Sequence, residues 1–257
     1  GLAVESVLSQ SFSDFELCVV DDASVDATKE VLDSFEGGFK SIQLPENGGV
    51  SKARNSGINA TDSEWVAFLD SDDIWHKEKL EKQISAAFER PDHFLHFTDE
   101  IWIRNGLRIN PKRRHQKLEG WIFQPSLELC MMAPSTVMLK RELLEKCGLF
   151  DENLQVCEDY DLWLRITAHH QVALLNEALM TRHGGHADQL SRKYWGMDRF
   201  RVQSLKKILA NVSLHKEDEI AARRVMRKKC KILLKGFRRR NKLDEVRYYE
   251  SLLQNHC

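Results

Sequence analysis

The sequence predicts an α/β fold, with a mostly parallel sheet flanked by helices and a helical extension at the C-terminus. Two observations lead to this prediction. In the first third of the 257 residues, short apolar runs typical of strands alternate with segments of helical periodicity. From Tyr194 onward the pattern is helical to the end, and residues 223–242 hold eleven Lys and Arg and no acid. We therefore expect one domain over residues 1–192 and a basic helical extension over residues 193–257.

Three buried strands and four helices are expected near the N-terminus. The strands are short apolar runs, at residues 15–20, 41–44 and 65–69. The helices show helical periodicity with a capping residue or a glycine or proline near an end, at residues 3–9, 26–35, 50–60 and 77–89. This alternation is typical of right-handed βαβ units with parallel strands, which bind ligands at the carboxyl ends of the strands.

The middle of the chain is less regular than either end. An irregular strand, a short helix, a second helix and another strand are expected at residues 93–103, 141–147, 159–169 and 171–175. The segment around Trp121 shows no clear period. The C-terminal helical pattern breaks near Asn211 and again near Asn241, which predicts three helices there.

Composition and charge exclude several classes of protein. The apolar fraction of 42% is enough for a sizeable core, and the net charge of -1 is unlike that of a general nucleic-acid-binding protein. The six cysteines form no C-x-x-C pair, which favours free thiols in a reducing compartment over a disulfide framework or a zinc site. The sequence has no apolar run of about 18 residues and no signal-peptide pattern, so we expect a cytoplasmic protein.

Acidic residues follow a predicted strand at the edge where ligands of such sheets bind. Asp70 and Asp72 come directly after the strand at 65–69, and alternate residues of an extended segment point the same way. Two carboxylates on one side make an oxygen site suited to Mg²⁺ or Mn²⁺. The alternative is a solvated turn in which Asp72 or Asp73 caps the next helix.

Two further acidic pairs are open to a functional or a structural interpretation. Asp21 and Asp22, after the first strand, could accept hydrogen bonds from a base or a ribose hydroxyl, or could form an Asx-turn. Glu158 and Asp159 begin a helix, where the helix dipole favours acids, and this pair could supply a general base that deprotonates a hydroxyl. Asp161 lies two residues later and could be confused with that base.

Four sequence runs occur in an order that is specific in combination. They are SVLSQSFSDFELCVVDDASVDAT, NGGVSKARNSGI, WVAFLDSDDIW and CEDYDLWLRI. This set closely resembles the family 2 glycosyltransferases, and the resemblance covers about residues 2–190. It implies the GT-A fold, with a Rossmann-like sheet, and an enzyme that moves a sugar from a nucleotide diphosphate to an acceptor hydroxyl.

The resemblance implies a donor site. Asp22 matches the family's contact to the nucleotide base, with Asp21 beside it, and Arg54 matches a position near the donor pocket. Asp70 matches the first acid of the family's D-x-D motif, near the ribose and the diphosphate. Asp72 matches the principal metal ligand of that motif, with Asp70 as its companion, so the implied cofactor is Mg²⁺ or Mn²⁺.

The resemblance also implies an acceptor side. Asp159 matches the catalytic base of this inverting family, and Glu158 is its neighbour. Residues 134–136 match a stretch that lines the acceptor site, and residues 189–191 match a loop that closes on the donor. The implied reaction is a single displacement, in which Asp159 takes the proton of the acceptor hydroxyl and the anomeric configuration inverts.

The resemblance favours a UDP-sugar as donor and a glycan or lipid-linked acceptor, in polysaccharide or glycolipid synthesis. Relatives begin with a strand of the kind VSVIIPTYNR, whereas this sequence starts part-way through the helix that follows it. Because a central sheet edge would then be bare, a non-catalytic nucleotide-sugar-binding or scaffold protein stays as a second hypothesis. A nucleotidyltransferase would want a Gly-rich phosphate loop, which this sequence does not show.

The basic C-terminal run has two interpretations. A basic amphipathic helix within residues 220–237 could touch anionic lipid, which would suit an enzyme with a lipid-linked acceptor. Alternatively, the helices pack on the first domain while their Lys and Arg stay solvated, and we favour this interpretation. We expect no nucleic-acid partner, because the run lacks the interleaved aromatic residues on which single strands stack.

Overall fold

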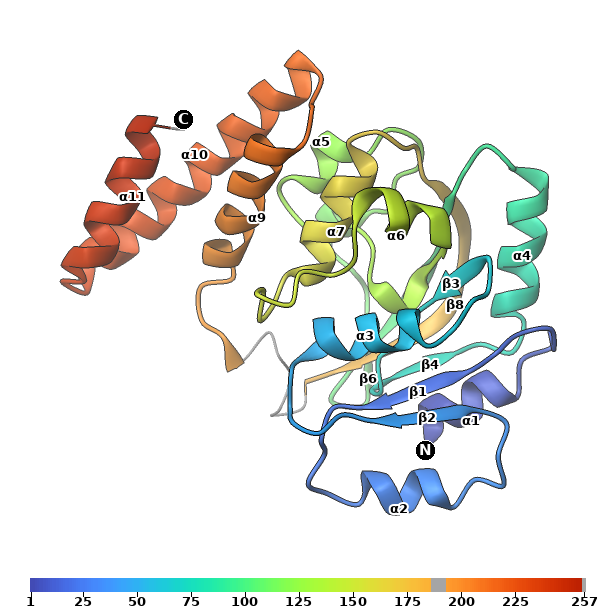
Figure 1. The fold of residues 1–257 in the computed structure, drawn as a ribbon. Helices are drawn as coiled ribbons and strands as arrows, with labels where there is room; N and C mark the ends of the chain where they lie inside the picture. Colours follow the sequence, from blue (N-terminus) through green and yellow to red (C-terminus); the bar gives the residue numbers. More distant parts are fainter. Residues whose placement is uncertain (186–192, 256–257) are drawn as a thin grey trace.

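The computed structural model describes residues 1–185 and 193–255 and shows an α/β fold (Figure 1). The N-terminal segment lies at the bottom of the view and the C-terminal helices lie at the upper left, with the main sheet and its covering helices between them. The expected α/β class with a C-terminal helical part is confirmed.

The N-terminal βαβ unit forms as expected. Strands β1 (Cys18–Asp21) and β2 (Lys40–Gln43) pair in parallel, and helix α2 (Thr28–Asp33) connects them. Helix α3 (Val50–Asn59) packs against β1. The carboxyl end of β1 therefore lies close to the loop that leads into α3.

The main sheet has six strands in the order β3-β7-β5-β8-β4, with β6 paired to β5. The strands are β3 (Trp65–Ala67), β4 (Asp73–Trp75), β5 (Leu95–Arg104), β6 (Leu107–Ile109), β7 (Val137–Lys140) and β8 (Ala173–Gly184). β3 and β4 are the two end strands of this order, and residues 68–72 between them contain the D-x-D acids Asp70 and Asp72.

The expectation of a mostly parallel sheet was wrong. In the main sheet only β5 and β8 pair in parallel, while the β3–β7, β5–β7, β4–β8 and β5–β6 pairs are antiparallel. Within the described residues β3 pairs with β7 and not with β1. The alternation of strands and helices fixes parallel direction only for strands joined by a crossover, such as β1 and β2, whereas β7 enters beside β3 from later in the chain.

Helices cover the main sheet, and one of them, α7 (Glu158–Thr167), is tied to the segment before β7. The remaining helices before residue 186 are α1 (Leu2–Leu8), α4 (Lys79–Glu89), α5 (Phe123–Ser126), α6 (Arg141–Cys147) and α7 (Glu158–Thr167), with two 3₁₀ turns, η1 (Arg113–His115) and η2 (Pro134–Thr136). Helix α7 buries Leu162, Trp163 and Ile166, as its periodicity predicted. The indole of Trp163 donates to the Met132 carbonyl at 2.9 Å, which ties α7 to the segment before β7.

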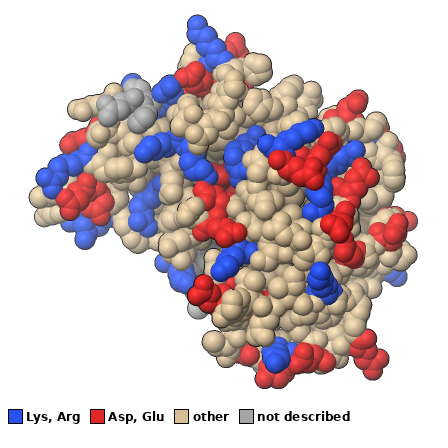
Figure 2. All heavy atoms as spheres, in the orientation of Figure 1, with Lys and Arg blue, Asp and Glu red and all other residues tan. Residues whose placement is uncertain are grey.

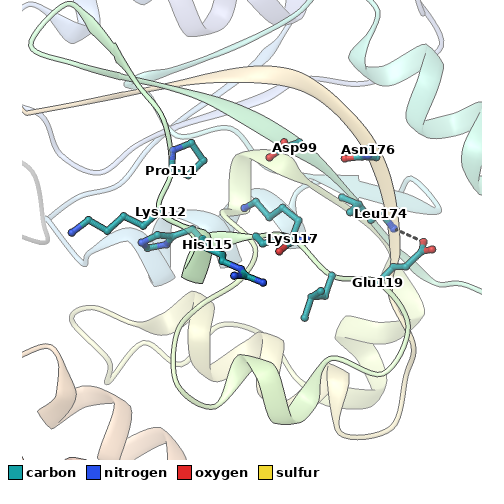
Figure 3. Close-up of a pocket in the computed structure, with 11 residues that line it drawn as sticks. Asp99, Pro111, Lys112, His115, Lys117, Glu119, Leu174 and Asn176 are labelled. Atoms are coloured by element: carbon teal, nitrogen blue, oxygen red, sulfur yellow. Dashed lines mark hydrogen bonds between the residues drawn. The ribbon is translucent and has the colours of Figure 1, made fainter.

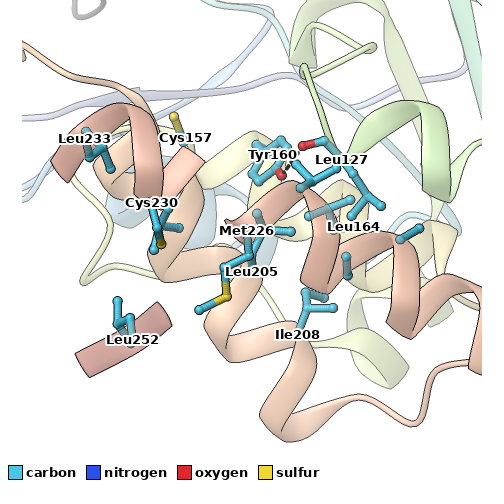
Figure 4. Packing of buried hydrophobic residues seen from close by; sticks show 14 of the residues in the cluster. Leu127, Cys157, Tyr160, Leu164, Leu205, Ile208, Met226, Cys230, Leu233 and Leu252 are labelled. Carbon is cyan, nitrogen blue, oxygen red and sulfur yellow. Dashed lines mark hydrogen bonds between the residues drawn. The ribbon is translucent and has the colours of Figure 1, made fainter. Parts of the chain in front are cut away.

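The C-terminal helices share a second hydrophobic core with α5 and α7 (Figure 4). They are α9 (Asp198–Asn211), α10 (Lys216–Arg239) and α11 (Leu243–Asn255). Met226 of α10 and Leu205 of α9 meet in this core near Tyr160. The breaks expected near Asn211 and Asn241 are confirmed.

Helix α10 packs as the favoured interpretation of the basic run predicted. Most of its apolar side chains are buried against α5, α9 and α11, although Ile220 and Ile232 are exposed. Most of its Lys and Arg also lie exposed, interspersed with acids over this part of the surface (Figure 2). Among the described residues, no helix is both long and apolar enough to cross a membrane.

Stability is expected to fall in mild acid because of His96. This side chain is 1% exposed in β5, and burial lowers its pKa to about 4, although its Nε2 bonds the His93 carbonyl at 2.9 Å. Between pH 6.5 and 4 the unfolded chain binds more protons at His96 than the folded protein does. The free energy of unfolding therefore decreases as pH is lowered, by up to about 1.4 kcal/mol per pH unit. Urea unfolding of the native chain and of His96→Gln should give curves that converge as pH falls; parallel curves would contradict this assignment.

Candidate active site

Three carboxylates, those of Asp70, Asp72 and Asp73, lie close together between the end of β3 and the start of β4 and are called the Asp70 group below. Asp70, Asp72 and Asp73 each place a carboxylate oxygen within 4.8 Å of the others. The Asp73 amide donates to the Asp70 carbonyl at 3.0 Å, a tight turn that brings the three side chains together. The expected pair Asp70 and Asp72 is thus joined by a third acid.

Asp73 is a strand residue rather than a helix cap. It opens β4, is 3% exposed, and accepts hydrogen bonds from the Ser135 hydroxyl at 2.7 Å and the His183 amide at 3.2 Å. Ser135 Oγ also accepts from the Asp70 amide at 3.1 Å, so this one hydroxyl holds both ends of the turn. The suggestion that Asp73 caps the next helix was therefore wrong, because β4 intervenes before α4.

The three carboxylates of the Asp70 group could together bind a divalent cation. Burial raises the pKa of Asp73 to about 7, and the neighbouring Asp70 adds to the rise. Like charges at this separation oppose one another, and an ion shared between their oxygens removes that repulsion. Carboxylates combined with phosphate oxygens and water are the ligands that Mg²⁺ and Mn²⁺ prefer, so the donor set suits either ion.

Arg54 connects this group to the start of α7. From α3 its guanidinium donates to Asp70 Oδ1 at 2.6 Å and to Glu158 Oε1 at 2.7 Å. The side chain is 10% exposed, and its guanidinium lies 5.1 Å from the Phe150 ring centre. A largely buried Arg that spans two acids fixes the distance between the two motifs.

The two acids that begin α7 have different environments. Glu158 is 7% exposed and is held by Arg54, whereas Asp159 is half-buried. Burial, and then the charge of Asp159, raises the pKa of Glu158, and Arg54 opposes the rise. Cys157 precedes them with φ of 63°, an uncommon value for a residue other than glycine, and turns the chain so that both acids start the helix. Asp159 is therefore the more exposed acid of this pair.

Asp161 is a structural residue. Its carboxylate is 1% exposed and accepts from Arg165 Nε at 3.0 Å and from Lys207 Nζ at 2.9 Å. Lys207 belongs to α9, so Asp161 ties α7 to the C-terminal helices. Because Asp161 is engaged in these ion pairs, it is distinguished from Asp159, the candidate base two residues earlier.

Cys130 is a neighbour of Asp159 that the sequence did not reveal. Its thiol lies 3.4 Å from Asp159 Oδ2 and 3.4 Å from the Met132 carbonyl oxygen. Burial raises the pKa of this thiol, and the nearby Asp159 charge adds to the rise, so the sulfur stays protonated and can donate to the carboxylate. Nothing in the local sequence around Cys130 indicates this long-range contact.

Asp21 and Asp22 are engaged with backbone groups at the end of β1. Asp21 accepts from the Ser24 amide at 3.0 Å, which is a turn of the kind weighed for this pair. Asp22 accepts from the amides of Gly48 and Gly49 at 2.7 and 2.8 Å and so closes the loop before α3. The structure does not bring these two acids into contact with the Asp70 group.

Two further segments were predicted from the resemblance, residues 134–136 and 189–191. Residues 134–136 form η2 and are buried, with Ser135 directed at Asp70 and Asp73. Residues 189–191 lie outside the described residues.

The fold is similar to that of solved structures of S. aureus TarS. S. aureus TarS matches with a TM-score of 0.67 and 21% identity, over 88% of this chain and 40% of that one. The structure described as TarS 1-349 in complex with UDP matches with a TM-score of 0.59 and 20% identity, over 98% of this chain and 86% of that one. At these identities the likeness shows the fold, and it confirms the GT-A expectation.

Two curated relatives are closer in sequence. WfgD of Escherichia coli, described as a UDP-Glc:alpha-D-GlcNAc-diphosphoundecaprenol beta-1,3-glucosyltransferase, is 33% identical over 175 residues, 68% of this chain and 66% of its own length. AmsB of Erwinia amylovora, an amylovoran biosynthesis glycosyltransferase, is 33% identical over 61% of this chain and 55% of its own length. This chain thus spans no more than 66% of either relative.

The family match covers the N-terminal part of the site. The family described as Glycosyl transferase family 2 matches residues 2–148, more than half of the 257 residues. This range includes Arg54 and the Asp70 group and ends before Glu158. Together with the four motifs and the fold, this match shows that the chain belongs to glycosyltransferase family 2.

Proposed function

We propose that this protein transfers a sugar from a nucleotide diphosphate sugar to an acceptor hydroxyl, in a single displacement that inverts the anomeric carbon. The observation that carries the proposal is the bridge made by Arg54. It holds the Asp70 group and the Glu158–Asp159 pair on two sides of one site, at hydrogen bonds of 2.6 and 2.7 Å. A transferase of this kind needs both parts, one for the leaving diphosphate and one for the attacking hydroxyl.

In this proposal Asp159 is the general base. Its half-buried carboxylate takes the proton from the acceptor hydroxyl while the oxygen attacks the anomeric carbon opposite the leaving group. Asp70, Asp72 and Asp73 would hold Mg²⁺ or Mn²⁺, which would neutralise charge on the departing diphosphate. Glu158 and Arg54 position these groups, and no covalent sugar–enzyme intermediate is required.

The donor in this proposal is a UDP-sugar. The name of WfgD specifies UDP-Glc, and one of the similar TarS structures is described as a complex with UDP. Asp21, Asp22, Arg54 and Asp70 are the proposed donor contacts. Since Asp22 already binds two backbone amides, we expect it to shape the loop beside the nucleotide as well as to meet the base.

The proposed acceptor is a glycan or a lipid-linked molecule, in polysaccharide or glycolipid synthesis. The name of WfgD specifies a lipid diphosphate that carries a sugar. Residues 134–136 are proposed to support the acceptor side. We propose residues 1–192 as the catalytic domain and 193–257 as an extension that could bring the protein to the cytoplasmic face of a membrane.

Binding of UDP should depend on a divalent ion and on Asp72. With Mn²⁺ and UDP at 100 times its dissociation constant, binding stabilises the folded state by about 2.7 kcal/mol and should raise the melting temperature by about 5–10 °C. Chelator or Asp72→Ala should abolish the shift, because Asp72 contributes to the charged group that holds the ion. Thermal unfolding with UDP, GDP, CDP and dTDP measures this and identifies the base.

A matched control is Asp92→Ala, which removes an exposed acid from the loop before β5. It should keep the full shift. A shift that survives chelator and Asp72→Ala would contradict the metal site, and no shift with any nucleotide would contradict the transferase proposal. Metal-dependent binding without transfer to any acceptor would favour a nucleotide-sugar-binding protein instead.

A further inference from the structure

A cavity of about 650 Å³ lies between the segment 111–119 and strands β5 and β8 (Figure 3). Its volume is in the range of small-molecule binding sites. Asn176 of β8 and Lys112 and His115 of the segment lie around it. None of the groups assigned above to the donor, the metal or the base lines this cavity.

The cavity has an excess of positive charge. Of its two acids, Glu119 is paired with Arg90 at 2.7 Å, whereas Asp99 bonds a backbone amide, that of Glu100, at 2.9 Å. Lys112 and Arg113 are exposed, and neither forms an ion pair within the part of the chain that the structure describes. Two cations and one unpaired carboxylate remain, which leaves the lining positive.

Lys117 is the lining residue that holds the segment 111–119 in place. Its ammonium donates to Glu100 Oε1 at 2.6 Å and to the Met131 carbonyl at 2.9 Å. The side chain of Lys117 is 10% exposed and that of Glu100 is 3% exposed. Burial alone would raise the pKa of Glu100, but Lys117 and Arg182 lower it overall, so this buried pair stays charged. The ion pair anchors the segment 111–119, and Lys112 and Arg113 are left to meet a ligand.

The same anchor connects the cavity to the proposed base. Met131, which accepts from Lys117, follows Cys130, whose thiol lies 3.4 Å from Asp159 Oδ2. A ligand in the cavity would therefore sit on the acceptor side of the site, next to the segment that contacts the base.

The other lining groups suit a phosphate with an attached organic part. The His115 ring packs on Trp102 at 5.1 Å, and burial and the nearby cations lower its pKa, which favours the neutral ring. Its Nε2 accepts from Arg114 Nε at 3.2 Å, so Nδ1 carries the proton of the neutral ring and is the nitrogen that can donate. Asn176 adds an amide, and Leu118 and Leu174 add apolar surface. The cavity is larger than a phosphate group needs and leaves room for what the phosphate is attached to.

We propose that this cavity binds the phosphate groups of an anionic acceptor, with Lys112 and Arg113 as the residues that recognise them. This inference rests on the proposed function, because it names the acceptor chemistry of that same site. Two sources share this chemistry, a lipid-linked diphosphate and a glycan that carries phosphate.

Inorganic pyrophosphate is the first probe, used by isothermal titration calorimetry in chelator so that the metal site does not contribute. Lys112→Ala combined with Arg113→Ala should weaken binding at least tenfold. The matched control, Lys231→Ala combined with Lys235→Ala, removes the same charge from the exposed face of α10 and should change binding less than twofold. Equal binding by both double variants, or none by the native chain, would overturn the proposal.

Two further measurements separate this proposal from the proposed function. The Lys112/Arg113 double variant should keep the Mn²⁺-dependent UDP shift, because these residues lie outside the donor site. A native chain that binds pyrophosphate but not UDP would count against the transferase and not against the cavity. Farnesyl diphosphate and glucose 1-phosphate, titrated in chelator, distinguish the two sources. Tighter binding of the first than of pyrophosphate assigns a lipid-linked acceptor, and tighter binding of the second assigns a phosphate-bearing glycan.

Discussion

Asp159→Asn should lower the rate of sugar transfer by about 10²–10⁴-fold while the protein stays folded. The amide cannot take a proton from the acceptor hydroxyl. It keeps an oxygen that can accept from the Tyr160 amide, which the carboxylate contacts at 2.6 Å, so stability should change little. The measurement is the rate of UDP release from a UDP-sugar with an acceptor that supports turnover, beside the melting temperature with UDP and Mn²⁺.

Asp161→Asn is the matched control, since it makes the same change two residues later. It should lower the stability of the fold by about 1–3 kcal/mol, because Asp161 is 1% exposed and loses its charge-assisted bonds, whereas Arg165 and Lys207 stay partly exposed and Lys207 keeps Asp151. The fraction that remains folded should transfer sugar at close to the native rate. If Asp159→Asn kept a tenth or more of the native rate, Asp159 would not be the base.

The sequence predicted elements better than it predicted their partners. Helix α7 was expected at 159–169 and runs Glu158–Thr167, because its buried residues recur at helical spacing. The strand expected at 171–175 is β8 (Ala173–Gly184), which continues past the exposed Asn176 and Glu177. Its pairing with β5 shifts register nearby, so polar residues interrupt the apolar pattern there without ending the strand. Periodicity gives the type of an element, whereas sheet direction depends on contacts made elsewhere in the chain.

The same limit applies to the candidate site. Asp70, Asp72 and Asp159 lie in local motifs and could be named from the sequence. Ser135 meets Asp73 across 62 positions and Cys130 meets Asp159 across 29, so no local pattern encodes either contact. These supporting residues become visible only once β7 and α7 are packed beside the turn after β3.

Arg54→Leu is expected to have the second large effect, on stability and donor binding together. Leu keeps apolar contact with Phe150 but leaves Glu158, whose side chain is 9% exposed, without its cation. Removing one partner of a buried ion pair costs about 3–5 kcal/mol. Asp70 also loses its 2.6 Å partner, so the Mn²⁺-dependent shift with UDP should shrink. Arg54→Lys is the matched control and should lose less, because it keeps the charge but not the two-pronged geometry.

The cost of Arg54→Leu should depend on pH in a direction that the site fixes. Burial and Asp159 already raise the pKa of Glu158 against the opposition of Arg54, so without Arg54 that pKa rises further above its unfolded value. Between the unfolded and folded pKa values the folded state binds more protons, and stability therefore falls as pH rises. Urea unfolding should show a larger loss at pH 8 than at pH 5.5. Adding Glu158→Gln removes the buried charge and should recover most of the loss at pH 8; a double variant no more stable than Arg54→Leu would mean that Arg54 does not act by neutralising Glu158.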